Sequence, residues 1–409
     1  MNLKSITIVI FVLILSEIVS GICTAAPNET ISNAESPLIL DGQVQQFQAP
    51  PTAVSSDIKL EHTLWSKTLD GYPLIAPIAY KDITFINTSS SLLAIETSTG
   101  NLKWEHTTPD DSVQISTPVI VGTYICYTKV DTLYVLEADS GQLAWFKKLQ
   151  KDSENLDLHS MGTYDNLLIF TDHNELKAIN VETQEEVWVN HQSMFSYSEP
   201  TLHIVGENIF VAIPGSIYIY NAANGETIKS WETGNIHSSL HIWGDKVIAV
   251  GTFGEVEACD IETGELLWKF ITNENVGVAR SGIAFSEDTL YITNHKDGFL
   301  YAISPENGNL QWSKQIGTPT FARRIFYVNS KPTYHNQVIY IGRWVEEDSS
   351  SSSNFKPLKG EMLALDSTSG DILKKYPIPK SFAQAPLIIN GKFLVLPASG
   401  SSGDVVMIE

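Results

Sequence analysis

Cysteine is scarce in this chain. Its 409 residues include three cysteines, Cys23, Cys126 and Cys259, and no two of them are adjacent. No Cys-x-x-Cys-His motif for covalent haem attachment is present. Cys126 and Cys259 fall in different, well-separated copies of the repeat described below, so we expect two buried thiols rather than a disulfide.

Positive charge is also scarce. The chain has 26 lysines and arginines against 47 aspartates and glutamates, which gives a formal net charge of −21. Such an excess of negative charge excludes nucleic acids and anionic membrane surfaces as partners. The arginines lie together in one part of the chain, at Arg280, Arg323, Arg324 and Arg343.

The chain lacks an apolar run long enough to span a membrane. The longest candidate, residues 6–15, follows Lys4 and is shorter than the ~20 residues of a transmembrane helix. Small residues follow, which predicts a signal peptide over residues 1–25 with cleavage after Ala25. An uncleaved anchor and lipidation of Cys23 are the alternatives, although Ile22 does not suit a lipobox and the membrane would be reached only through such an anchor.

Residues 26–57 have little periodicity and are rich in proline and polar side chains, which predicts a disordered linker. The region that follows, residues 58–409, contains an internal repeat. A serine-rich acidic insert at residues 346–354 interrupts one copy, and we expect it to be a mobile loop.

The repeat is a predicted β-hairpin that recurs at intervals of roughly forty residues, the period of a propeller. An alternating apolar segment ends near an Ala-x-Asp, a turn follows, and a second strand ends in an aromatic residue. Copies occupy residues 94–104, 138–145, 178–188, 220–231, 258–268, 302–312 and 364–376. Glycine occupies the turn in six of these copies, where positive φ is needed. Gln184 replaces it in the third copy, and we expect a looser turn there.

A tryptophan recurs at the end of the second strand. Because an indole ring buries a large flat surface and has one N–H that needs a partner, this recurrence predicts packing between neighbouring repeats rather than ligand binding. The residues assigned this structural role are Trp65, Trp104, Trp145, Trp188, Trp231, Trp268 and Trp312.

The segments between the hairpins contain eight further polar turns, each followed by a strand rich in β-branched and aromatic residues. Eight turns and seven hairpins are reconciled if the chain ends share a blade. We expect residues 60–68 to pair beside residues 405–409 and to complete blade eight, which leaves no open edge. The predicted fold is therefore all-β, an eight-bladed β-propeller over residues 58–409.

The Ala-x-Asp-x-x-Thr-Gly-x-x-x-Trp pattern, complete at residues 258–268, resembles the pyrroloquinoline quinone (PQQ) repeat. Quinoprotein dehydrogenases and non-enzymatic, BamB-like propellers share this repeat. The resemblance covers nearly all of the chain after residue 57 and implies the same eight-bladed fold, with each tryptophan docked on the turn of an adjacent blade. It does not choose between the two functions, because the motif is structural.

The residues of quinoprotein catalysis cannot be assigned in this sequence. The resemblance would imply an adjacent cysteine pair, a calcium site and a catalytic aspartate, and no segment matches them. His237 and His241 are four residues apart on a strand, about 13 Å, too far to share one zinc ion. No zinc-protease, nucleophile-elbow or phosphate-loop motif occurs. We expect no catalytic residue, metal or cofactor, and PQQ with calcium only if the enzyme alternative holds.

The clustered arginines are the candidate binding site. Arg280, Arg323, Arg324 and Arg343 lie near strand ends in blades six and seven, and Trp344 is adjacent to the last of them. Guanidinium groups beside aromatic rings suit an anion or a peptide. The alternative is local pairing with the abundant carboxylates.

These observations predict an exported, monomeric, non-catalytic propeller that binds protein partners in the periplasm, at the cell envelope or at the cell surface. The resemblance to the BamB-like branch implies a role in envelope protein assembly. Two alternatives remain open: a PQQ-dependent alcohol or sugar dehydrogenase, and a carbohydrate-binding propeller that uses aromatic residues at its rim.

Overall fold

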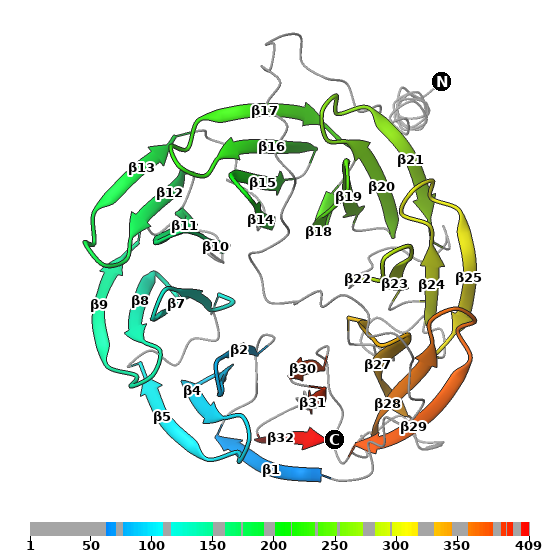
Figure 1. Cartoon of the computed structure of the whole chain (residues 1–409), viewed down its shortest axis with the longest axis horizontal. Coiled ribbons are helices and arrows are strands. Elements are labelled where there is room, and N and C mark those ends of the chain that lie inside the picture. Colours follow the sequence, from blue (N-terminus) through cyan, green and yellow to red (C-terminus); the bar gives the residue numbers. More distant parts are fainter. Residues whose placement is uncertain are drawn as a thin grey trace, which may run out of the picture.

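The chain folds as a ring of β-sheets (Figure 1). The computed structural model describes residues 63–70, 77–108, 116–149, 160–172, 175–191, 201–213, 215–233, 236–251, 254–272, 283–294, 297–317, 331–345, 359–378, 386–389, 391–395 and 402–408. These residues form eight four-stranded antiparallel sheets, and no described residue is helical. The prediction of an eight-bladed, all-β propeller is confirmed. The signal peptide and linker lie outside the described residues and stay predictions.

The first four blades follow one another along the chain. Blade 1 contains β2 (Ile78–Tyr80), β3 (Ile83–Asn87), β4 (Ser91–Glu96) and β5 (Leu102–Thr107). Blade 2 contains β6 (Val119–Val121), β7 (Tyr124–Lys129), β8 (Thr132–Glu137) and β9 (Leu143–Lys148). Blade 3 contains β10 (Met161–Tyr164), β11 (Leu167–Asp172), β12 (Glu175–Asn180) and β13 (Glu186–Asn190). Blade 4 contains β14 (Thr201–Val205), β15 (Asn208–Ile213), β16 (Ser216–Asn221) and β17 (Thr227–Glu232).

The next three blades continue the pattern. Blade 5 contains β18 (Ile236–Trp243), β19 (Lys246–Gly251), β20 (Glu255–Asp260) and β21 (Leu266–Ile271). Blade 6 contains β22 (Ile283–Phe285), β23 (Leu290–Asn294), β24 (Phe299–Ile303) and β25 (Leu310–Gln315). Blade 7 contains β26 (Thr333–His335), β27 (Val338–Val345), β28 (Lys359–Asp366) and β29 (Ile372–Ile378). In each blade the first strand lies nearest the axis of the ring and the fourth lies at the rim (Figure 1).

Blade 8 is built from both ends of the chain. It contains β30 (Leu387–Ile389), β31 (Lys392–Val395), β32 (Ser402–Ile408) and, outermost, β1 (Thr63–Asp70). Strand β1 runs antiparallel to β32, with Lys67 opposite Val405 and Thr68 opposite Asp404. This pairing confirms that the N-terminal strand closes the ring, although residues 60–62 lie outside the described part.

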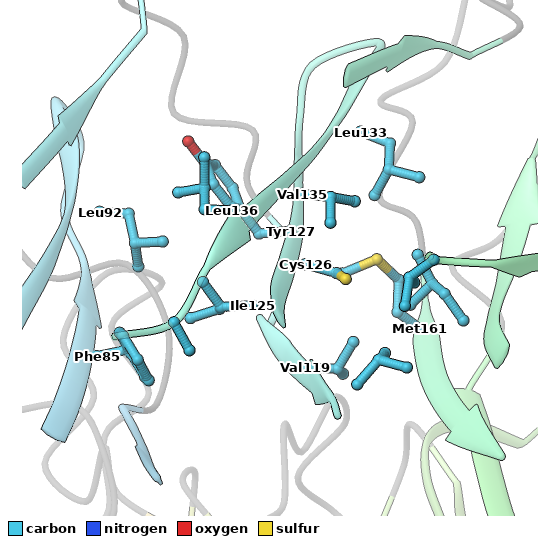
Figure 2. Close-up of a cluster of buried hydrophobic side chains, with 14 of the residues drawn as sticks. Phe85, Leu92, Val119, Ile125, Cys126, Tyr127, Leu133, Val135, Leu136 and Met161 are labelled. Carbon is cyan, nitrogen blue, oxygen red and sulfur yellow. The ribbon is translucent and has the colours of Figure 1, made fainter. Parts of the chain in front are cut away.

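The two middle strands of each blade supply most of the core. All five residues of β3 are buried, because neighbouring blades cover both faces of the sheet. Outer strands such as β5 alternate between exposed and partly buried positions. One core cluster runs from Phe85 in blade 1 through Cys126 in blade 2 to Met161 in blade 3 (Figure 2). Cys126 and Cys259 are both buried and neither forms a disulfide, as predicted.

The tryptophans connect successive blades. The Trp104 indole lies against Gly141 in the next blade, where a Cβ atom would stand 2.4 Å from Trp104 Cδ2, and Gly141 has a φ of +72°. Trp104 Nε1 also donates a hydrogen bond of 3.0 Å to the Ala138 carbonyl of that turn. The same indole-to-turn hydrogen bond is made by Trp65, Trp145, Trp188, Trp268 and Trp312.

The turn that contains Gln184 keeps the geometry of the others. Gln184 has a φ of +64°, and its amide donates to the Asn180 carbonyl at 2.9 Å, as Gly100 does to Glu96. The expectation of a looser turn is therefore wrong. A long polar side chain tolerates the left-handed region at a cost of about 1–2 kcal/mol, and the surrounding turn holds it there.

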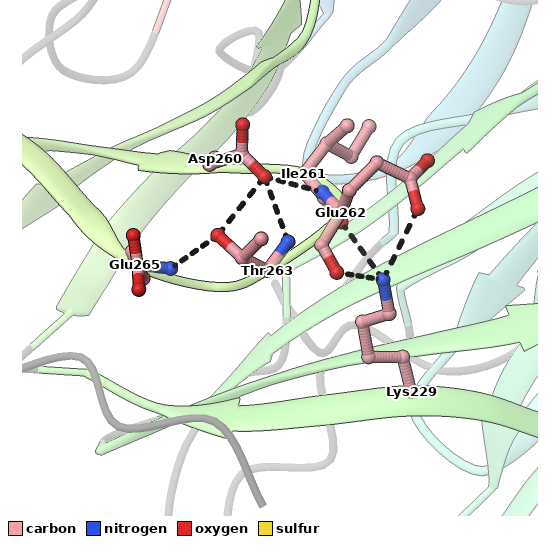
Figure 3. Close-up of polar contacts among 6 residues, drawn as sticks. All are labelled: Lys229, Asp260, Ile261, Glu262, Thr263 and Glu265. Atoms are coloured by element: carbon pink, nitrogen blue, oxygen red, sulfur yellow. Dashed lines mark hydrogen bonds and ion pairs between the residues drawn. The ribbon is translucent and has the colours of Figure 1, made fainter. Parts of the chain in front are cut away.

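Trp231 is the exception among the docked tryptophans. It packs on Gly264 of blade 5, but its buried Nε1 has no hydrogen-bond partner. Lys229 reaches this turn instead, where its ammonium contacts the backbone carbonyls of Ile261 and Glu262 and the Glu262 carboxylate (Figure 3). The Lys229 ammonium thus donates to the Ile261 carbonyl, which corresponds to the carbonyl that accepts from an indole N–H in the other blades.

Candidate functional site

The arginine patch is only partly described. Arg280, Arg323 and Arg324 and the Trp344 side chain lie outside the described part of the structure. Arg343, on β27, faces Glu361 on β28, with Nη2 2.6 Å and Nε 2.8 Å from Glu361 Oε2. Its Nη1 donates to the Ile316 carbonyl at 2.8 Å. Arg343 is therefore held in a local ion pair, which agrees with the alternative considered for it.

The rim of the ring presents apolar side chains on the outermost strand of every blade. Phe146 on β9 is 59% exposed and Leu373 on β29 is 58% exposed, the two highest values. The others are Leu64, Leu102, Leu143, Val187, Ile228, Leu267, Ile271 and Leu310. Single apolar residues are normal on a protein surface, and their even spacing follows from the repeat.

Blade 2 carries an aromatic row that reaches this rim. Phe146, Tyr134 and Tyr127 lie on adjacent strands, with ring centroids 6.4 Å and 5.3 Å apart. His106 of blade 1 lies over the row, and its Nδ1 is 2.6 Å from the Tyr127 hydroxyl. Burial, with a smaller effect of Lys129, lowers the pKa of His106. The row therefore runs from the core to the surface, and its aromatic side chains and His106 carry little charge.

Two histidines lie near the axis of the ring. His203 on β14 and His241 on β18 stand at the same repeat position, because each lies three residues before the first residue of the turn into the following strand, where they pair with Phe210 and Ile248. The other blades carry no histidine at this position, where they have Ile78, Val119, Gly162, Ala284, Thr333 and Leu387. Innermost strands of adjacent blades are neighbours in the ring, so the two histidines meet.

The two imidazoles form a compact group with residues of the next blades. Their ring centroids are 6.0 Å apart, and the Phe285 ring on β22 lies 5.4 Å from His241 on its other side. Lys331, two residues before β26, is close enough to affect the charge of His241. We call His203, His241, Phe285 and Lys331 the axial cluster. Four consecutive blades, 4 to 7, contribute one residue each.

The environment of the axial cluster disfavours positive charge. Burial, then His203 and Lys331, lowers the pKa of His241 to about 3. Burial also lowers the pKa of His203 and of Lys331. The Lys331 side chain is nevertheless exposed. Protein surrounds it on several sides, but solvent still reaches it. Both histidines are therefore neutral at pH 7.

The described residues do not form a metal centre. They contain no group of three or more histidine, cysteine, aspartate or glutamate side chains placed to hold an ion. Within the same ranges, no helix is long and apolar enough to cross a bilayer.

Sequence reasoning missed the axial cluster. The sequence directed attention to His237 and His241, four apart on one strand, and the His237 side chain lies outside the described residues. The informative signal was the repeat position: Leu-His-Ile-x-Gly followed by an acidic residue occurs at 202–207 and again at 240–245. Aligning the innermost strands of the repeats would have placed His203 beside His241.

Comparison with known proteins adds the following. A family model described as outer membrane protein assembly factor BamB matches residues 33–230 and 172–346. No curated protein sequence matches the chain. Among solved structures, BamB from Moraxella catarrhalis is similar over 84% of this chain and 99% of its own, with 14% identity and a TM-score of 0.63.

An enzyme and a designed protein share the fold as well. The quinohemoprotein alcohol dehydrogenase ADHIIG from Pseudomonas putida HK5 is similar over 85% of this chain and 76% of its own, with 12% identity and a TM-score of 0.63. The computationally designed Ika8 protein is similar over 84% of this chain and 99% of its own, with 14% identity and a TM-score of 0.62. At these identities the likenesses establish the fold and no activity.

Proposed function

Because the chain belongs to the family described as outer membrane protein assembly factor BamB, we propose that it is a non-catalytic scaffold that binds protein partners. The observation that carries the proposal is the extent of the family match, which begins before the propeller and reaches blade 7. The structural likeness to BamB also spans nearly all of that protein, whereas about a quarter of the quinohemoprotein dehydrogenase has no counterpart here.

The proposal includes export. The leader predicted over residues 1–25 would deliver the propeller to the periplasm, the cell envelope or the cell surface, and residues 26–57 would separate it from any N-terminal anchor. A role in the assembly of envelope proteins extends the described role of the family to this chain. The acidic net charge of −21 suits partners with basic contact surfaces.

The contact surface that we propose is on blades 6 and 7. Arg280, Arg323 and Arg324 fall in the sequence before these blades, in a chain that has few positive charges. Arginine is enriched at the centres of protein interfaces, where its planar guanidinium group makes several directed hydrogen bonds. Arg343 is excluded from this set, because Glu361 and the Ile316 carbonyl already hold it.

In-cell photo-cross-linking tests this proposal. A photoreactive residue replaces Leu373 on the rim of blade 7, and a matched control replaces Phe146 on blade 2, which is equally exposed. We expect a discrete cross-linked protein from position 373, little from position 146, and at least a tenfold loss of the adduct in the Arg323→Ala, Arg324→Ala double variant, about 1.4 kcal/mol or more. No adduct from either position, or an adduct unchanged in a folded double variant, would contradict the proposed surface.

A further inference from the structure

We propose that the axial cluster is a binding site for a small oxyanion, a phosphate or a carboxylate, held by His203, His241 and Lys331. Nothing in the proposed scaffold function uses these residues. His203 and His241 lie on strands nearest the axis rather than at the rim, and Lys331 lies just before such a strand, β26 (Figure 1). The observations that support the site are the meeting of the two imidazoles, the nearby ammonium group and the surrounding side chains.

The first step is the supply of hydrogen-bond donors. A neutral imidazole donates through one ring nitrogen, an imidazolium through both, and a lysine ammonium through its three N–H groups. Within the described residues, neither His203 nor His241 makes a hydrogen bond, although both side chains are partly buried. The ring nitrogens of both residues are absent from the fully buried atoms that lack a partner, so solvent reaches these donors and a small anion can reach them as well.

The second step is the sign of the missing partner. The groups that act on the charge of His241 are His203 and Lys331, and no carboxylate of the described residues is among them. Strands β15 and β22, which flank β18, carry no titratable side chain. Lys246 of the neighbouring β19 is already paired with Asp245 and Glu306. A cation would find no carboxylate among these groups, whereas an anion would meet imidazole N–H donors and the Lys331 amine.

The third step is size. With ring centroids 6.0 Å apart and charge-assisted hydrogen bonds of about 2.8 Å, one phosphate or carboxylate group can bridge the two rings. Phe285 covers the other flank of His241 and removes water from that side. A bound anion would therefore give up hydrogen bonds to water and accept hydrogen bonds from the protein, in a place where electrostatic attraction is only weakly screened.

Binding is expected to take up protons. An anion beside His203 and His241 favours their charged forms, so it raises the lowered pKa values of both groups, and affinity must then increase as the pH falls. We expect tighter binding at about pH 6 than at about pH 8. For each proton taken up, the affinity should increase by up to tenfold for every pH unit by which the pH falls.

Calorimetry of the purified full chain tests the site, with inorganic phosphate and succinate as separate probes. Titrations in two buffers of different ionisation enthalpy count the protons taken up. We expect one of the two probes to bind at one site with proton uptake, and the preferred probe identifies phosphate or carboxylate as the ligand group. The variants His203→Gln, His241→Gln and Lys331→Met should each weaken binding about tenfold or more, because each removes a charge-assisted hydrogen bond.

His191→Gln is the matched control, because His191 is an exposed histidine at the rim of blade 3, paired with Glu175. It should bind like the unaltered chain. The proposal is overturned if neither probe binds the unaltered chain, or if folded His203→Gln and His241→Gln variants bind normally. Histidine ring signals in NMR spectra of the unaltered chain give a second readout that does not depend on variant folding: two of them must shift on addition of the probe, and unchanged signals overturn the site.

Discussion

One indole ring and one turn without a side chain set the distance between most pairs of adjacent blades. At Gly141 an added methyl group would overlap the Trp104 ring, and the φ of +72° is also unfavourable for other residues. Gly122 provides a comparison, because it has a similar φ of +59° but no atom lies within 4 Å of the place that a Cβ would occupy. Replacing each glycine by alanine therefore separates the cost of a positive φ from the cost of overlap with the indole ring.

We predict that Gly141→Ala lowers the free energy of unfolding by about 3 kcal/mol or more, and Gly122→Ala by about 1 kcal/mol. The first figure combines left-handed strain with the overlap on Trp104, and the second contains strain alone. Urea unfolding followed by tryptophan fluorescence measures both variants. Equal losses would show that the indole contact contributes nothing.

A second prediction concerns the indole N–H. Trp104→Phe removes a hydrogen bond of 3.0 Å to the Ala138 carbonyl, whereas Trp231→Phe removes a buried N–H that has no partner. Both variants remove the same part of the indole, although Trp231 is more deeply buried than Trp104. We therefore expect Trp104→Phe to be the more destabilising of the two by about 1–2 kcal/mol in the same unfolding experiment. A larger loss for Trp231→Phe would refute this account of the Trp231 site.

The aspartate of the repeat turn gives a pH-dependent prediction. Hydrogen bonds from the Thr368 hydroxyl, and from the Thr368 and Ser369 amides, lower the pKa of Asp366. A carboxyl whose folded pKa lies below its unfolded value stabilises the fold at neutral pH, and this contribution is lost as the pH falls through the folded pKa. Asp366→Asn should therefore be less stable than the unaltered chain at pH 7, with a difference that shrinks as the pH falls below the usual aspartate pKa of about 3.9 and vanishes below the lowered pKa of Asp366. Thermal unfolding across this range measures it, and a difference that persists in acid would contradict the explanation.

Individual residues were predictable where the repeat dictates them. The docked tryptophans and the turn glycines could be placed from spacing alone, because each performs the same packing task in every blade. Trp231 and Gln184 departed from the pattern for reasons of local geometry: Lys229 reaches the carbonyl that Trp231 would use, and Gln184 accepts a positive φ. His203 and His241 were missed because their partnership exists only between blades.

Cross-strand pairing decides the role of Arg343. In sequence it is separated from Glu361 by the low-complexity insert, and only the register of β27 with β28 places the two directly opposite each other. Sequence alone therefore left both ion pairing and ligand binding open for the same arginine. The strands themselves were predictable, because their alternating or continuous apolar patterns follow from burial on one or both faces.

We predict a modest coupling between these two residues. In a double-mutant cycle with Arg343→Met and Glu361→Gln, the interaction energy should be about 1 kcal/mol, because both side chains are about four-fifths buried yet still reached by solvent. Either single variant should destabilise the chain more than the double variant. Additive effects would show that the ion pair contributes no stability.

Strand β1 closes the ring of blades by pairing with β32. The chain ends meet in blade 8, where Thr68 lies opposite Asp404. We expect the Thr68→Cys, Asp404→Cys pair to form a disulfide under mild oxidation and to raise the unfolding midpoint, since it closes a loop of nearly the whole chain. The out-of-register pair Ser66→Cys, Asp404→Cys is the control. Mass spectrometry and thermal unfolding measure both, and cross-linking of the control pair alone would contradict the register.

The whole fold was predictable because seven copies of the hairpin and eight inner turns encode it, so a weak copy is recognised from the others. Function was not, because the repeated residues are used for contacts between blades, and the fold that they specify is also that of BamB and of a quinohemoprotein alcohol dehydrogenase. Residues that break the repeat, such as the arginines before blades 6 and 7 and the paired histidines of blades 4 and 5, are therefore the candidates for a function particular to this chain.

The most direct test of a non-catalytic role is dye-linked oxidation by the purified chain supplied with PQQ and Ca²⁺. The assay uses a panel of primary alcohols and aldose sugars, with PQQ binding followed in parallel by absorbance. The scaffold account predicts no substrate-dependent dye reduction, even if the carboxylates of PQQ occupy the axial cluster. Substrate-dependent turnover that a chelator abolishes and added Ca²⁺ restores would contradict it and identify the chain as a quinoprotein oxidoreductase.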